Sequence, residues 1–283
     1  MKKLVSQALE IVERFESANS RAFDILSEKQ PEDRYCVCSA ISECCSMRTR
    51  SAFSLLSNGL IWDALIIQRT IIHGTAKMCY LLSSDDNTIC AKRFQEYTET
   101  APMREYGSMY PHICAMLKTG LFGDEQKKMY VEQNILEPTK EMKVTETTPQ
   151  IVKDEVDSSV KHLNYLKISP VLKNELEYWG KMCVVFDNEY SVANSYVHMN
   201  HNAICEQINF YSKSEQDSRR ATYAHVANKL FLMCALQCAR SEVLFKRAEL
   251  DPSEMRNIMS RDLPFIKKVD KFCAAETNDM LNR

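Results

Sequence analysis

The sequence contains little glycine and proline, with 6 Gly and 8 Pro in 283 residues. These residues normally interrupt regular structure, and the strict alternation that marks half-buried strands is also scarce. Apolar residues recur instead at i, i+3 and i+4 along most of the chain, which is the spacing of amphipathic helices. The pattern predicts an all-α protein, a multi-helix bundle of about nine to eleven helices.

Several common binding motifs are absent. The sequence has no glycine-rich phosphate loop, no H-E-x-x-H and no EF-hand pattern. A phosphate would therefore have to be held by side chains or helix N-termini. The formal net charge of −2 gives no support for bulk electrostatic attraction to duplex nucleic acid, which leaves a local basic groove as the alternative. We expect no cofactor.

Membrane and secretory signals are also absent. No uncharged stretch reaches the ~18 residues of a membrane span. Glu10 and Glu13 interrupt the apolar residues near the N-terminus, so no signal peptide is expected. Most of the 12 cysteines lie in apolar helical contexts, where a free thiol behaves as a small hydrophobe. We expect a cytoplasmic protein with free cysteines and no membrane association.

Breaking and capping residues divide the chain into helices joined by short turns. A first helix is predicted over 3–28, a second over 33–58 that ends at Asn58-Gly59, and a third that ends at Leu82. Ser169-Pro170 resembles an N-cap followed by proline at the first helical position. Further helices are predicted over 88–100, 103–118, 124–136, 170–186, 190–211 and 217–250, with another after Asp251-Pro252. We expect one helical domain over 1–283, with the polar segment 137–150 as a mobile loop or insertion.

The third predicted helix carries a polar seam in an otherwise apolar segment. Arg69, His73 and Tyr80 fall within roughly 60° of one another on a helix. Buried charge is costly unless it is paired, so this seam needs either a structural partner or a function. One interpretation is that Arg69 pairs with a carboxylate on a neighbouring helix and His73 is a core histidine. The other is a ligand-binding or catalytic seam.

A second polar cluster runs from Ser195 to Cys205. Ser195 and His198 are three residues apart and could form a hydrogen-bonded nucleophile and base. His198, His201 and Cys205 share a helix face and could contribute ligands to a transition metal. No metal site is expected, because such ligands rarely converge from one helix alone.

A third cluster contains Arg93 and Tyr97, which are one helical turn apart. These charges could simply be solvated on a surface helix. Alternatively, Arg93 is a second cation beside Arg69 in a phosphate-binding cleft, since guanidinium, imidazole and phenol groups all donate hydrogen bonds to phosphate oxygens.

A fourth motif has the spacing R-x4-H, from Arg220 to His225. It resembles the R-x4–6-H signature of HEPN-type ribonucleases, which are all-helical proteins common in bacterial toxin and phage-defence systems. This resemblance implies a metal-independent RNA-cleaving site built from the Arg and His of two protomers. The polar residue that often follows the Arg in that family is absent here.

A longer set of residues resembles a group of bacterial all-helical proteins of unknown activity. The set consists of Arg69, Tyr80-Leu81-Leu82, Arg93-Phe94, Tyr97 and Ser195-x-x-His198, within residues 50–210. Members of that group carry an acidic residue four positions after the first Arg, where this chain has His73. The resemblance implies a helical fold with one shared polar centre.

These features predict a cytoplasmic bacterial effector that acts on RNA or a nucleotide phosphate, as a toxin or in phage defence. Arg69, His73, Ser195 and His198 are the candidate catalytic residues, with a histidine as general base and arginines stabilising charge on phosphorus. Tyr80, Arg93, Tyr97 and His201 are the candidate substrate-binding residues. The expected partners are RNA or a nucleotide, a cognate protein such as an antitoxin, or a second copy. The alternative is a non-enzymatic helical interaction module or scaffold.

Overall fold

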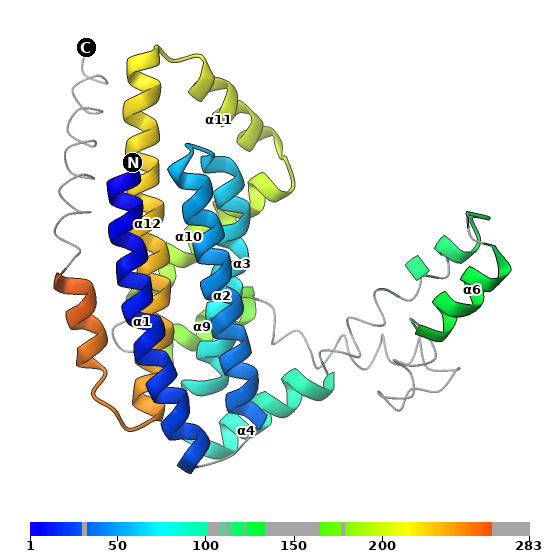
Figure 1. Ribbon diagram of the computed structural model, residues 1–283, viewed down its shortest axis with the longest axis vertical. Coiled ribbons are helices and arrows are strands. Elements are labelled where there is room, and N and C mark those ends of the chain that lie inside the picture. Colours follow the sequence, from blue (N-terminus) through cyan, green and yellow to red (C-terminus); the bar gives the residue numbers. More distant parts are fainter. Residues whose placement is uncertain are drawn as a thin grey trace. The chain divides into compact units, whose positions relative to one another are not determined.

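The computed structural model describes residues 1–29, 33–100, 109, 112–113, 115–121, 123–133, 165–176 and 179–261. All the regular elements in these ranges are helices, which confirms the all-α prediction (Figure 1). They are α1 (Lys2–Lys29), α2 (Asp33–Ser57), α3 (Ile61–Leu82), α4 (Asn87–Gln95), the π-helix η1 (Glu96–Thr100), α6 (Asp124–Val131), α9 (Tyr165–Glu175), α10 (Trp179–Val197), α11 (His201–Tyr211) and α12 (Glu215–Arg247). A last helix covers 253–261. The predicted loop at 137–150 lies outside the described residues.

The chain packs as two compact units. The larger consists of residues 1–84 and 169–283, and the smaller of residues 85–168. The larger unit contains α1, α2, α3, α10, α11 and α12, and the smaller contains α4, η1 and α6. The expectation of a single domain remains a prediction.

Helix α3 occupies the centre of the larger unit. It packs against α2, α10 and α12. Most of its apolar residues, such as Ile71, Met78 and Leu81, are completely buried, as expected from the nearly continuous apolar sequence of this segment. Gly74 permits the close approach of α2, because a Cβ at this position would lie 2.5 Å from the Cys45 sulfur. Among its polar residues, Gln68 and Thr75 are also buried, whereas Asp63 is exposed.

Helices α1, α2 and α12 form the rest of the bundle and lie side by side (Figure 1). The buried residues of α1 follow the i, i+3, i+4 pattern read from the sequence: Leu4, Val5, Ala8, Ile11, Val12, Phe15, Ala18, Ala22 and Leu26. Helix α12 is buried on nearly all sides over its second half, from Leu232 to Phe245. It is the longest described helix, and α1, α2 and α3 all pack on it.

Local sequence signals place several helix ends correctly. Gly59 has a φ of +77°, and Leu60 N donates to Leu55 O at 3.0 Å, so α2 ends in the glycine turn that Asn58-Gly59 predicts. An aspartate cap also precedes the last helix, where Asp251 Oδ1 accepts a 2.9 Å hydrogen bond from Ser253 N.

Three sequence-based boundaries are wrong, and one of them is the break predicted between 186 and 190, which lies inside the continuous helix α10. Pro170 lies inside α9, and the Ser169 hydroxyl donates to Asp187 Oδ1 at 2.6 Å instead of capping a helix. The helix predicted over 190–211 is broken after Val197. Met199 has a φ of +46°, and the Asn200 side chain accepts from Ala203 N at 3.1 Å to begin α11. At Asn200 the side-chain hydrogen bond to the backbone marks the start of the new helix.

The cysteines within the described ranges are free, as predicted. Most are buried, and burial raises the pKa of Cys183 to about 11, which keeps this thiol protonated and unreactive at neutral pH. No helix in the described part of the chain is both long and apolar enough to cross a membrane.

Candidate functional site

The polar seam of α3 faces α10, where it meets the ring of Tyr190. The Arg69 guanidinium carbon lies 5.3 Å from the centroid of this ring, and the His73 ring lies 6.4 Å from it at an interplanar angle of 80°. Arg69 and His73 therefore share a face, as their four-residue spacing predicts. The cation interacts with the π-face of a buried tyrosine, and Arg69 Nε is itself buried without a hydrogen-bond partner.

The carboxylate beside this seam is Glu189, which is bound by two other residues. Its Oε2 accepts a 3.0 Å hydrogen bond from Gln68 Nε2 and lies 2.5 Å from Lys229 Nζ. The Lys229 side chain is only 6% exposed and that of Glu189 12%, so this is a buried ion pair. The pair joins α3, α10 and α12, and each charge compensates the other.

A second buried cation lies further along the bundle. Arg240 of α12 is completely buried and donates to the Thr75 hydroxyl of α3 and to the Gln237 amide oxygen. Among the described residues, no carboxylate forms an ion pair with this guanidinium. The arginine thus contributes a second polar connection between α12 and α3.

The structure does not bring Ser195 and His198 to this seam. His198 follows Tyr190 by eight residues, which corresponds to about 12 Å along a helix axis. The Ser195 hydroxyl donates to its own helix, to Ser191 O at 3.2 Å, and His198 is exposed in the turn after α10. His201 begins α11, and its Nε2 lies 3.5 Å from the Cys205 sulfur.

The remaining predicted site residues lie away from Arg69 and His73 or belong to the other unit. Tyr80 is buried two helical turns beyond His73, about 10 Å along α3. Arg93 is buried in α4 and Tyr97 lies in η1, and both residues belong to the smaller unit. Within the described ranges no three His, Cys, Asp or Glu residues form a group that could hold a metal ion.

An aromatic cluster fixes the junction of α3, α10, α11 and α12. Trp62 stacks on Tyr196 with ring centroids 4.8 Å apart, and the edge of Phe210 meets Trp62 at 5.6 Å. His225, the histidine of the R-x4-H motif, packs 6.2 Å from Trp62 and 6.3 Å from Phe210. The Tyr196 hydroxyl donates to Glu206, and burial, followed by this hydrogen bond, raises the pKa of Tyr196.

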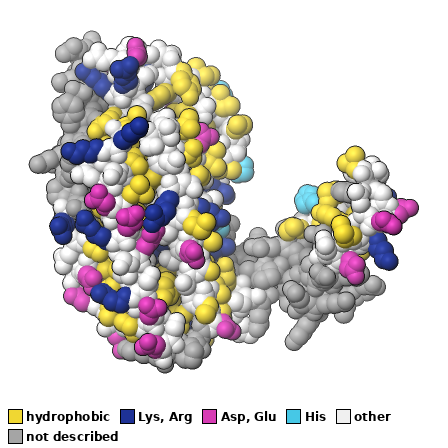
Figure 2. Space-filling view, viewed as in Figure 1, with side chains coloured by type: hydrophobic (Ala, Val, Ile, Leu, Met, Phe, Trp, Pro, Cys, Tyr) yellow, Lys and Arg dark blue, Asp and Glu magenta, His cyan; other side chains and the backbone are white. Residues whose placement is uncertain are grey.

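Outside this cluster, α11 exposes an apolar stripe. Ile204, Ile208 and Tyr211 follow one another at spacings of four and three residues and are 44%, 61% and 71% exposed. Met199, in the turn before α11, is also exposed. Hydrophobic side chains gather over this end of the bundle in Figure 2. We call these four residues the α11 stripe.

Sequence reasoning missed Glu189, Tyr190 and Lys229, which complete the seam. One indication of Lys229 as a buried polar residue was present in the sequence, because this lysine interrupts the apolar segment that begins at Val226. Its partner was not readable, since Glu189 and Gln68 come from distant parts of the chain.

Comparison with models of known protein families finds none that matches this chain. Comparisons with curated proteins and with solved structures find no match either.

The environment of His225 predicts a pH-dependent stability. Burial holds the pKa of His225 below its ordinary value of 6.5, and the nearby Lys229 charge adds to this effect. Below this pH the unfolded chain binds a proton that the folded chain resists, so the free energy of unfolding falls as the pH drops from about 7 to 5. We expect His225→Gln to reduce this loss in urea titrations at each pH.

The matched control is His198→Gln, which removes an exposed histidine and should retain the wild-type loss of stability. If His225→Gln shows the same slope of stability with pH as the wild type, the burial of this imidazole is not the cause.

Proposed function

We propose that this chain is a non-enzymatic helical interaction module and that the α11 stripe is its docking surface. The single observation that carries this proposal is an exposed row of apolar side chains on α11. The opposite side of this helix is fixed by the contact of Phe210 with Trp62 and of Glu206 with Tyr196. Apolar residues at alternating spacings of four and three form the seam along which two helices pack. A helix with the same spacing is therefore the complementary partner.

The polar seam supports this interpretation. A catalytic centre needs a water-accessible cleft beside Arg69, with its base and nucleophile within hydrogen-bond reach. Here the Glu189 carboxylate is bound by Lys229 and Gln68, and Arg69 and His73 both pack on Tyr190. These contacts are those expected of a structural network that joins helices.

The partner that we propose for the α11 stripe is a second copy of this chain. A copy of α11 offers the same apolar spacing, so two such helices can pack by twofold symmetry, with each stripe contacting the other. The formal net charge of −2 adds little repulsion between two copies. The stripe is short, and the expected dimer is weak and reversible.

We expect Ile208→Glu to abolish this dimer, because it places a charge at the centre of the apolar contact. The measurement is sedimentation velocity of the full chain over a range of concentrations. Wild-type protein should shift from monomer to dimer as concentration rises, and Ile208→Glu should remain monomeric. Asn209→Glu adds the same charge at the adjacent exposed position and should dimerise like the wild type. A wild type that stays monomeric, or a dimer that persists in Ile208→Glu, would contradict the proposal.

The second candidate is the activity on RNA or a nucleotide predicted from the sequence. It is favoured by one observation: Arg69 Nε is buried with no partner beside His73. A bound phosphate could supply the missing acceptor.

This candidate predicts that purified protein cleaves end-labelled RNA. Arg69→Ala and His73→Ala should each lose this activity, whereas Arg48→Ala, which removes an exposed arginine of α2, should retain it. Absence of cleavage by the wild type, or equal cleavage by all four proteins, would remove the candidate.

A further inference from the structure

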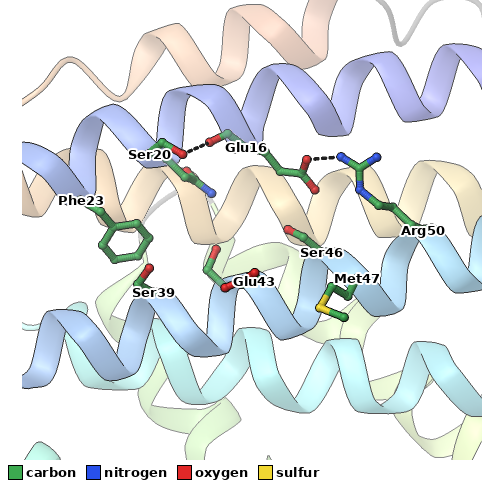
Figure 3. A pocket seen from close by; sticks show the side chains of 10 residues that line it. Glu16, Ser20, Phe23, Ser39, Glu43, Ser46, Met47 and Arg50 are labelled. Atoms are coloured by element: carbon green, nitrogen blue, oxygen red, sulfur yellow. Dashed lines mark hydrogen bonds and ion pairs between the residues drawn. The ribbon is translucent and has the colours of Figure 1, made fainter.

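A polar groove lies between α1 and α2, and none of the residues that line it belongs to the seam or to the α11 stripe. Its volume is about 360 Å³, within the range of small-molecule sites. Figure 3 shows side chains from both helices pointing toward one another across it. The lining residues are Glu16, Asn19, Ser20 and Phe23 of α1, and Ser39, Ser42, Glu43, Ser46, Met47 and Arg50 of α2.

The most informative lining residue is Asn19. It is only 4% exposed, yet neither Oδ1 nor Nδ2 of its amide has a hydrogen-bond partner. A buried amide without partners destabilises the folded chain, so such groups are rare in native structures. The amide belongs to the lining of the groove, and it carries an acceptor and a donor side by side.

The charges in the groove exclude an anionic ligand. Arg50 is its cation, and this guanidinium already pairs with Glu16 and lies 3.5 Å from Glu13 Oε1. Contact with Glu16 raises the pKa of Arg50, as expected for an occupied ion pair. Glu43 adds a further carboxylate to the lining. A phosphate or carboxylate would therefore meet negative charge without a free cation.

The other lining groups suit an aromatic, uncharged ligand. Phe23 offers a ring at one end of the groove, on which a planar base can stack (Figure 3). Ser39, Ser42 and Ser46 form a row of hydroxyl groups on α2, at spacings of three and four residues. Hydroxyl groups both donate and accept hydrogen bonds, as recognition of a ribose requires.

We propose that the groove between α1 and α2 binds an adenine-type nucleoside without a phosphate, with the base edge on Asn19. An asparagine amide pairs with adenine through two hydrogen bonds, because Oδ1 accepts from the N6 amino group and Nδ2 donates to N7. This pairing satisfies both unpartnered atoms of Asn19. The ring of Phe23 provides a face for the base.

The test is isothermal titration calorimetry of the full chain with adenosine, inosine and adenosine monophosphate. Adenosine should bind at one site. Inosine should bind at least about tenfold more weakly, because its O6 cannot donate to Asn19 Oδ1. Adenosine monophosphate should also bind more weakly than adenosine, because the groove contains two carboxylates.

The Asn19→Leu variant tests whether a loss of adenosine binding can occur while the chain remains folded. This substitution removes the unpartnered amide at similar volume, so we expect the thermal midpoint to stay the same or to rise while adenosine binding is lost. Ser51→Ala is the matched control, since the exposed Ser51 hydroxyl lies outside the groove and is bonded to Met47 O at 3.1 Å, and this variant should bind adenosine like the wild type. Absence of adenosine binding, equal binding by a folded Asn19→Leu variant, or tighter binding of the monophosphate would each overturn the proposal.

Discussion

The buried ion pair between Lys229 and Glu189 is the interaction on which the arrangement of the larger unit depends. It joins α12 to α10, and Gln68 extends it to α3. Because a buried charge without a partner is strongly destabilising, this pair favours the observed register of α10 against its neighbours. That register places Tyr190 against Arg69 and Tyr196 against Trp62. Helix α11 follows α10 through a short turn, and the contact of Trp62 with Phe210 holds α11 against α3.

The polar groups of this protein thus have two different environments. In the interior several of them connect helices, as Arg240 does with Thr75, and this role accounts for charges in otherwise apolar segments. In the groove between α1 and α2, Asn19 makes no such connection and keeps its hydrogen-bonding capacity. A buried polar group that connects nothing is better evidence of ligand binding than one that joins two helices. The groove and the α11 stripe are therefore the surfaces on which we base binding proposals.

The sequence predicts those structural features that depend on residues close together along the chain. The all-helical class and the end of α2 at Asn58-Gly59 follow from local spacing and turn chemistry, and the common face of Arg69 and His73 follows from helical periodicity. Pro170 was placed wrongly because its helix begins earlier and Ser169 bonds to the distant Asp187. The contacts of the seam with Tyr190, Glu189 and Lys229 could not be predicted, since they depend on how α3, α10 and α12 pack against one another. Whether the smaller unit contributes Arg93 and Tyr97 to any site remains a prediction.

The most direct test is a double-mutant cycle on the central ion pair, read as the free energy of unfolding in urea. Lys229→Met and Glu189→Leu each leave one buried charge without its partner, and each should cost about 3–5 kcal/mol. The double variant removes both charges and should be less destabilised than either single variant. Additive costs, or single variants within about 0.5 kcal/mol of the wild type, would contradict the central role of this pair.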